Sequence, residues 1–154
     1  MNEFMKIAIE EALHGMKNDE GGPFGAVVVR NGEIISKAHN EVVKTNDPTA
    51  HAEVVALRKA SSALGRFDLS DCEIYSSCEP CPMCFSAIHW AKIKKLYYGS
   101  TREDAANIDF DDQYIYDVIK GTAKVLQVEV LQINREESLE PFKEWKSKMD
   151  RVQY

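Results

Sequence analysis

A regular alternation of helical and strand patterns along the chain constrains its fold more than any other feature. Apolar residues three and four positions apart predict a helix over residues 4–16, which ends near residues 21–23. Strands at 26–30 and 33–38 then flank an Asn-Gly pair at 31–32, the sequence that favours a two-residue hairpin turn. A chain that alternates in this way packs its helices onto a single sheet.

The remaining elements continue the alternation. Helices are predicted at 50–64, 80–91, 112–120 and 139–149, and strands at 73–76, 95–98 and 125–133. Gly65 favours the end of the first of these helices, and Pro80 favours the first turn of the second. About five strands with helices between them predict an α/β fold, in which one mixed sheet carries helices on both faces. A chain of 154 residues has the usual length of one domain, so residues 1–154 are expected to form a single domain.

The charge balance and the N-terminal segment restrict the possible partners. Nineteen basic and twenty-five acidic side chains give a formal net charge of -6. This is the wrong sign for neutralising many phosphates without a local basic patch, so we expect a small-molecule substrate and no nucleic acid partner. The first sixteen residues mix charged with apolar side chains, unlike a signal peptide or a membrane span. We therefore expect a cytoplasmic protein without membrane contact.

Four cysteines lie within thirteen residues, and two of them stand at the start of a predicted helix in Pro80-Cys81-Pro82-Met83-Cys84. Two thiols three residues apart share one helix face, and the positive end of the helix dipole favours their thiolate forms. Disulfides are a poor explanation in a chain with no export signal, and nothing else resembles a thioredoxin-like redox protein. Cys81 and Cys84 are therefore predicted to ligate one metal ion.

A histidine and a glutamate upstream of the cysteines complete the predicted site. His51 and two thiolates would fill three positions of a tetrahedral zinc ion and leave the fourth for water, as in catalytic zinc sites. Glu53 would hydrogen-bond that water and accept its proton. Because residues two apart point to nearly opposite sides of a regular helix, both can reach one ion only if the site lies over the helix end.

Cys78 supports a rival interpretation. With His51, Cys81 and Cys84 it would make a closed structural zinc site of three cysteines and one histidine, and the protein would be a binding module instead of an enzyme. Cys78 falls at the end of the predicted strand before Pro80, which favours a side chain that faces away from the other two cysteines. The two interpretations stay open at this point.

The combination of H-x-E with P-C-x-x-C resembles the zinc deaminases of nucleobases. The chain is similar to the cytidine deaminase superfamily, in the branch that holds guanine deaminases and tRNA adenosine deaminases. The likeness covers nearly the whole length and is carried by Asn46-Asp47-Pro48-Thr49-Ala50-His51-Ala52-Glu53 and Cys78-Glu79-Pro80-Cys81-Pro82-Met83-Cys84. The resemblance implies a three-layer α-β-α fold with a five-stranded mixed sheet, one zinc ion (Zn2+) per subunit and hydrolytic deamination.

Further segments resemble small bacterial guanine deaminases in particular. These are Gly21-Gly22-Pro23-Phe24-Gly25, Ala87-Ile88-His89-Trp90-Ala91, Phe110-Asp111-Asp112-Gln113-Tyr114-Ile115-Tyr116 and the terminal Tyr154. The resemblance implies a homodimer whose subunits exchange their C-terminal segments, at about residues 110–154. Each segment would then cover the pocket of the partner subunit.

The same resemblance implies roles for five residues outside the metal site. Asn40 would bind the purine, and Phe24 and Trp90 would enclose it. Asp112 would contact its amide edge or assist proton transfer, and Tyr154 would close the pocket. Simpler explanations exist, because Phe24 and Trp90 can be core residues and Tyr154 a frayed end. Asn40 can cap a turn, and Asp112 can provide the N-terminal charge of a helix.

The implied reaction is hydrolysis of guanine at C2 to xanthine and ammonia, a step of purine base catabolism or salvage, with Glu53 moving the protons. A tRNA adenosine deaminase shares the metal motifs but needs a basic surface for folded RNA. Acidic residues interrupt the C-terminal lysines, which is more typical of a solvated helix face. Guanosine, cytosine or another aminated ring also stay open. His14, His39 and His89 lack ligand spacing to the cysteines and are expected to be surface or packing residues.

Overall fold

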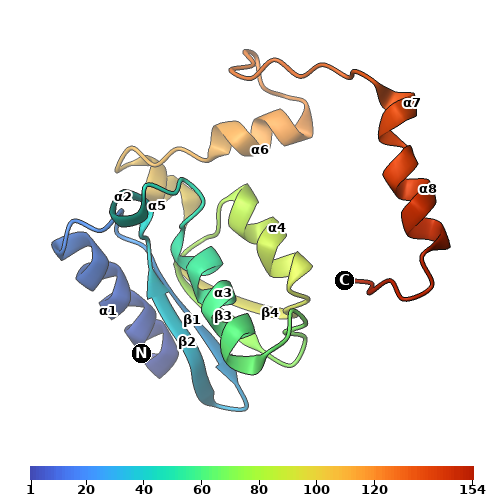
Figure 1. Ribbon diagram of the computed structural model, residues 1–154. Helices are drawn as coiled ribbons and strands as arrows, with labels where there is room; N and C mark the ends of the chain where they lie inside the picture. Colours follow the sequence, from blue (N-terminus) through green and yellow to red (C-terminus); the bar gives the residue numbers. More distant parts are fainter.

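The computed structural model describes residues 1–154 and has a four-stranded sheet at its centre (Figure 1). The elements are α1 (Glu3–Lys17), β1 (Gly25–Arg30), β2 (Glu33–His39), α2 (Val42–Thr45), α3 (Ala52–Leu64), β3 (Glu73–Cys78), α4 (Pro82–Trp90), β4 (Lys95–Ser100), α5 (Arg102–Ala106), α6 (Gln113–Lys120), α7 (Arg135–Ser138) and α8 (Glu140–Ser147). The strand order is β2-β1-β3-β4, with β3 and β4 parallel and the other pairs antiparallel. The predicted mixed sheet is confirmed, and the short helices α2 and α5 add to the predicted order.

The hairpin of β1 and β2 follows from its turn residues. Asn31 and Gly32 have φ angles of 51° and 78°, which is the left-handed conformation that this two-residue turn requires at both positions. The strands pair Gly25 with His39, so β2 ends beside the start of β1. This register places Asn40, the residue after β2, next to the loop that precedes β1.

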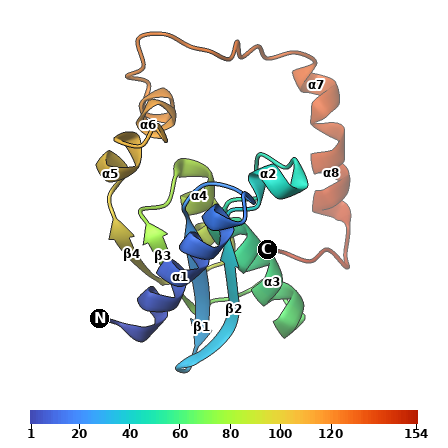
Figure 2. The same ribbon diagram turned by 90° about the vertical axis from the view of Figure 1, so that its left-hand side faces the viewer.

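Alternate residues of β1 face opposite sides of the sheet. Val27 and Val29 pack with Tyr75 against α1. Ala26 and Val28 belong to the larger core, to which α3 and α4 contribute. Figures 1 and 2 accordingly show α1 on one face of the sheet and α3 and α4 on the other. The predicted helices on both faces are confirmed.

The fifth strand predicted at residues 125–133 is wrong. The segment contains neither strand nor helix, and its apolar side chains are exposed, Val130 to 84%. Its β-branched residues suit a strand, but a strand needs the backbone of a neighbour for its hydrogen bonds. Within one chain the segment passes from α6 to α7 away from the sheet, and β4 stays an edge strand (Figure 1).

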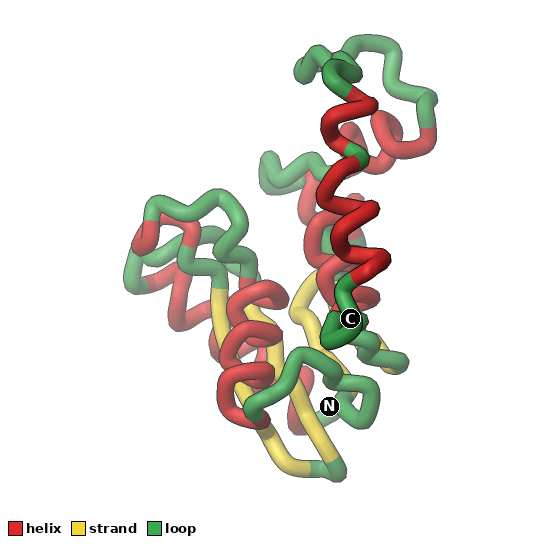
Figure 3. The backbone as a smooth tube through the Cα atoms, turned by 45° about the vertical axis from the view of Figure 1, so that its right-hand side comes forward, coloured by secondary structure: helices red, strands yellow, loops and turns green.

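The C-terminal helix predicted at residues 139–149 forms as α8, Glu140–Ser147, one residue shorter at its start and two at its end. The short α7 precedes α8, and Figure 3 shows the two helices following one direction beside the rest of the protein. Neither helix contains a buried residue. The chain then returns, so that the ring of Tyr154 lies 6.0 Å from that of Trp90. None of the helices combines the length and apolar character that crossing a membrane requires.

Candidate active site

The three predicted metal ligands meet at the N-terminal ends of two helices. Both α3 and α4 begin two residues later than the sequence pattern predicts, which makes His51 and Cys81 their N-cap residues, with extended backbone angles. Cys84 lies in the first turn of α4 and is fully buried. Nδ1 of His51 is 3.6 Å from the Sγ atoms of both cysteines.

The spacing of these atoms fits a tetrahedral zinc ion. Zn–S bonds of about 2.3 Å and Zn–N bonds of about 2.0 Å at a tetrahedral angle place sulfur and nitrogen roughly 3.6 Å apart. The ligand atoms of His51, Cys81 and Cys84 all lie within 4.8 Å of one another, and Cys78 is not in this group. The thiol of Cys78 instead donates to the carbonyl oxygen of Thr101 at 3.6 Å. Three potential ligand atoms are therefore grouped, and Cys78 does not join them in a closed group of four.

Glu53 stands beside the ligands because His51 precedes the helix instead of belonging to it. The extended backbone of His51 turns its side chain toward α4, while Glu53 occupies the first turn of α3. The divergence expected for residues two apart on a helix therefore does not arise. Glu53 is 6% exposed and accepts a hydrogen bond from Ser76 Oγ at 3.0 Å. Burial raises the pKa of Glu53, which suits a group that holds and releases a proton.

The ligand atoms influence one another's protonation. Hydrogen bonds from Cys84 and His51 lower the pKa of Cys81 to about 4. The neighbouring sulfur of Cys81 and burial raise the pKa of Cys84, and the hydrogen bond with Cys81 raises the pKa of His51. Opposite shifts of this kind arise where ligand atoms are packed closely, and a divalent cation replaces the shared protons.

A cavity of about 600 Å³ opens over the ligands. Among the predicted site residues its wall includes Phe24, Asn40, His51, Glu53, Cys81 and Asp112. Residues that the sequence did not single out complete the apolar part, namely Gly22, Val42, Val43, Met83, Phe110 and Ile115. A larger cavity of about 720 Å³ beside α5 and α6 contains none of the ligands. The smaller cavity is therefore the candidate substrate-binding cavity.

Phe24 and Asn40 are held together at the mouth of the hairpin. The backbone N–H of Asn40 donates to the carbonyl oxygen of Phe24 at 3.0 Å. Oδ1 of Asn40 accepts a hydrogen bond from the Val42 N–H at 3.1 Å, so Asn40 caps a turn as well as lining the cavity. The Phe24 ring meets Phe110 edge to face, with ring centroids 5.0 Å apart. One side of the cavity is therefore aromatic and the adjoining side carries a fixed amide.

Asp112 is the N-cap residue of α6, but its side chain makes no capping hydrogen bond. Asp111 accepts the hydrogen bond from the Gln113 N–H instead, at 3.1 Å. Burial and the negative charge of Cys81 raise the pKa of Asp112. The carboxyl group of Asp112 therefore does not cap the helix, and the residue lines the cavity instead.

Trp90 and Tyr154 do not line the cavity of their own chain. Trp90 ends α4 and is 66% exposed, and it lies in a separate surface hollow with Phe85 and His89. Tyr154 packs against the rings of Trp90 and Phe67. The predicted enclosure of a ligand by Trp90 and Tyr154 is therefore not formed within one chain.

Residues 1–100 match the family described as the cytidine and deoxycytidylate deaminase zinc-binding region. The chain belongs to this family. It is 45% identical to a guanine deaminase of Bacillus subtilis (strain 168) over 151 aligned residues. This alignment covers 98% of this chain and 97% of that protein. An X-ray structure of guanine deaminase from Bacillus subtilis superposes with a TM-score of 0.93 at 45% identity, over 100% of this chain and 99% of the other. A tRNA-specific adenosine deaminase of Agrobacterium fabrum is 36% identical over 146 residues, 89% of this chain and 95% of its own.

In this deaminase the segment that carries Cys81 is braced from outside the cavity. The Arg102 guanidinium pairs with Glu79 at 2.6 Å and lies 4.2 Å from the ring centroid of Tyr116. The Tyr116 hydroxyl donates to the carbonyl oxygen of Pro80 at 2.9 Å. These contacts connect α5 and α6 to the metal-binding loop, so they also fix the N-terminal end of α6.

Sequence reasoning did not single out Ser76, Phe110 or Arg102. Ser76 is the one polar side chain among the buried residues of β3, which are otherwise Ile74, Tyr75 and Cys78, and a buried serine is a suitable partner for a buried acid. Phe110 lies within a segment that was identified, but without a role of its own. Nothing in the sequence near Arg102 indicates that it reaches back to Glu79.

Proposed function

We propose that this deaminase hydrolyses guanine to xanthine and ammonia, with one zinc ion per subunit. The observation that carries the proposal is the buried Glu53 carboxyl beside three ligand atoms spaced for a metal ion, at the wall of a cavity. Similarity to a guanine deaminase over nearly the whole chain supports the choice of base. A small purine substrate also agrees with the net charge of -6.

Proton transfer by Glu53 follows from its place beside the ligands. Bound zinc would supply a water molecule that is nucleophilic at neutral pH, because the metal lowers the pKa of water from about 15.7 to about 7. Glu53 would accept a proton from the water as the water oxygen bonds to C2, and would deliver that proton to the ring nitrogen next to C2. A second transfer protonates the leaving amino group. One water is consumed and one ammonia is released, so the ring product is xanthine.

The wall of the cavity supplies recognition of the base. Phe24 and Phe110 offer apolar ring surface to a planar heterocycle. The amide nitrogen of Asn40 is left for the ligand, because Oδ1 of the same amide is already bonded to Val42. Asp112 approaches the N–H groups of the amide edge of guanine. These contacts orient C2 toward the metal ligands and Glu53.

We also propose a homodimer in which the C-terminal segment is exchanged between subunits. The segment 125–133 exposes apolar β-branched residues, and β4 has an unpaired edge in the single chain. Pairing of that segment with β4 of a second subunit would provide the missing fifth strand. Tyr154 would then close the neighbouring cavity, which the same chain's tail does not reach.

Mixed dimers test the exchange directly. A Glu53→Gln chain and a Tyr154→Ala chain are each expected to be impaired alone. If tails are exchanged, the mixed dimer contains one site with an intact Glu53 and an intact Tyr154, and up to about half of the wild-type turnover returns. If each tail serves its own subunit, mixing restores nothing. Size-exclusion chromatography with light scattering establishes the dimer beforehand.

The substrate is tested by ammonia release from guanine, guanosine, adenine, cytosine and cytidine, and from a tRNA anticodon stem-loop that contains the target adenosine. Guanine is expected to turn over fastest. The similarity to a tRNA-specific adenosine deaminase makes that activity the second candidate. Inosine formation in the stem-loop without guanine turnover would replace the first proposal by the second. Turnover of guanosine at the same rate as guanine would show that the cavity accepts a ribose.

A cytoplasmic location completes the proposal. All four cysteines are free, which agrees with a reducing compartment. The thiol ligands Cys81 and Cys84 would also stay available for the metal there. Activity and zinc in the cytosolic fraction of the source cells are the expected result.

A further inference from the structure

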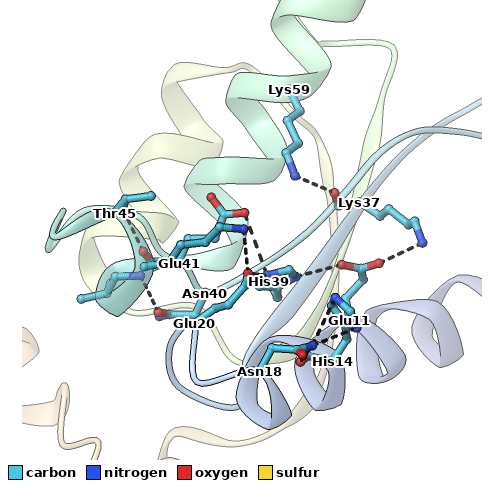
Figure 4. A network of polar contacts seen from close by, with 12 residues as sticks. Glu11, His14, Asn18, Glu20, Lys37, His39, Asn40, Glu41, Thr45 and Lys59 are labelled. Atoms are coloured by element: carbon cyan, nitrogen blue, oxygen red, sulfur yellow. Dashed lines mark hydrogen bonds and ion pairs between the residues drawn. The ribbon is translucent and has the colours of Figure 1, made fainter.

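His39, the last residue of β2, is buried between two carboxylates and directly precedes the cavity residue Asn40. It is 7% exposed. Its Nδ1 lies 3.1 Å from Oε2 of Glu11 on α1, and its Nε2 lies 2.5 Å from Oε2 of Glu20 in the loop after α1 (Figure 4). Each ring nitrogen of His39 thus lies within hydrogen-bond distance of a different carboxylate. The ring therefore connects the end of β2 to α1 and to the loop that leads to Phe24.

Glu20 extends this connection to a second part of the cavity wall. Its carbonyl oxygen accepts hydrogen bonds from the N–H groups of Val43 and Lys44 at 3.1 and 3.0 Å. Its carboxylate also binds Nζ of Lys44 at 3.1 Å. Glu20 thus holds α2, which begins two residues after Asn40, with both its backbone and its side chain. Val43 itself lines the cavity.

Two glycines leave the space that this arrangement requires. A Cβ atom at Gly15 would lie 2.4 Å from Cδ2 of His39, and a Cβ atom at Gly21 would lie 2.2 Å from Oδ1 of Asn40. Both distances are far below the optimal separation of about 3.5–4.0 Å between non-bonded carbon atoms. The α1 helix and the loop after it therefore approach the His39 ring and the Asn40 amide as closely as packing allows.

Cations of the protein itself pair with two of the carboxylates around His39. Three carboxylates and two ammonium groups surround it, those of Glu11, Glu20, Glu41, Lys37 and Lys44. Lys37 pairs with Glu11 at 2.9 Å, and hydrogen bonds from His39 and Lys44 lower the pKa of Glu20. Lys37 and Lys44 thus take up the carboxylates of Glu11 and Glu20, and the network holds segments of the protein together.

We propose that His39 is a positioning residue for substrate recognition, which fixes Asn40 and Phe24 at the separation that the purine ring requires. The inference rests on the proposed function, in which these two residues bind the base. His39 does not line the cavity and acts only through its neighbours. Loss of the network therefore weakens binding of the ring and leaves the metal ligands in place, so KM changes more than kcat.

The test compares His39→Gln and Glu20→Gln with Lys6→Gln, which removes an exposed charge of α1 outside the network. His39→Gln is expected to raise KM for guanine about tenfold while kcat stays within about twofold, and Glu20→Gln is expected to raise KM by less. Lys6→Gln should match the wild type. Zinc content per chain, measured beside the kinetics, should be the same in all four proteins.

Gly21→Ala provides a second route to the same result, because its Cβ atom would meet the side-chain and backbone oxygens of Asn40 and displace that residue without removing a charged group. It keeps the test decisive if His39→Gln does not fold. Unchanged KM in Glu20→Gln and in Gly21→Ala, or a fall in kcat and zinc content without a rise in KM, would overturn the inference alone. A wild-type protein that loads zinc and does not turn over guanine would overturn the proposed function, and the inference with it.

Discussion

The first hundred residues and the C-terminal part of the chain use their apolar side chains in opposite ways. The first part packs them into two clusters on the two faces of the sheet, and every buried residue but Ala105 lies there. The second part exposes them, as Val130 in the extended segment and Phe142 on α8 show. The first part is thus stabilised by its own core, whereas the second part has apolar surface that one chain does not cover.

The same division runs through the candidate site, because the candidate metal ligands lie in the first part and the cavity wall draws on both parts. The three metal ligands and Glu53 all belong to the first part, and the family match also ends at residue 100. The second part brings Phe110 and Asp112 to the cavity wall. Similarity to the Bacillus subtilis guanine deaminase continues through both parts. The candidate metal ligands and Glu53 therefore belong to the first part alone, while both parts contribute to the wall of the cavity.

The largest effect is expected from removing a metal ligand in the first part. Cys84→Ala should lose bound zinc and all measurable turnover, because two remaining ligands do not hold the ion. Cys78→Ala is the matched control, since its thiol bonds to Thr101 and lies outside the ligand group. It should keep both zinc and activity. Atomic absorption on the purified variants measures the metal, and loss of zinc from Cys78→Ala would refute the three-ligand site.

A change at the end of the second part should alter recognition and spare the metal. Tyr154→Ala is expected to raise KM for guanine about tenfold, since the residue proposed to close the cavity is lost, with zinc content unchanged. Gln153→Ala serves as the control. Steady-state kinetics together with direct zinc measurement distinguish weaker substrate binding from loss of the metal. A Tyr154→Ala variant with wild-type KM would show that the tail takes no part in binding.

The contact that joins the two parts should give a smaller effect on metal binding. Arg102→Lys keeps a positive charge but loses the forked hydrogen bonding to Glu79 and the flat contact with Tyr116. We expect zinc to be held about tenfold more weakly, as for other groups that support metal ligands indirectly. Competition with a chelator measures this. Arg135→Lys provides the control. Arg135 pairs with Glu136 on the exposed surface, so this change should leave zinc affinity unchanged.

The smallest effect concerns the pH dependence of stability in the first part. Hydrogen bonds from His39 and Lys44 lower the pKa of Glu20, so its ionised form is favoured in the folded state. This contribution is present above the ordinary pKa of glutamate and is lost as the pH falls through the lowered value. The difference in Tm between wild type and Glu20→Gln should therefore be largest near pH 7 and shrink toward about pH 3. A difference that grows with acidity would contradict the assignment.

Local signals predicted the elements of the first part well. The Asn31-Gly32 turn, the periodic pattern of α1 and the glycine after α3 each act over a few residues, and each is found where the sequence indicates. Both metal-binding helices were predicted two residues too early, because the prolines and small residues before them suit a first turn. His51 and Cys81 take extended N-cap conformations instead, and this is what brings them together.

Contacts between distant segments explain the rest. The strand expected at 125–133 has suitable residues, but no local pattern tells which strand edge it would pair with, and none within the chain does. The contacts of Arg102 with Glu79 and of Glu53 with Ser76 join residues twenty-three positions apart, so no local pattern in the sequence predicts them. Trp90 and Tyr154 were assigned by resemblance alone, and their placement in the single chain leaves their role to the proposed dimer.

The most direct test of the central claim is turnover of guanine by Glu53→Gln with zinc content measured on the same sample. If a buried acid beside a three-ligand metal site moves the protons, the variant should bind as much zinc as the wild type and show a kcat lower by about a thousandfold. A zinc-loaded Glu53→Gln protein with kcat close to that of the wild type would contradict the account.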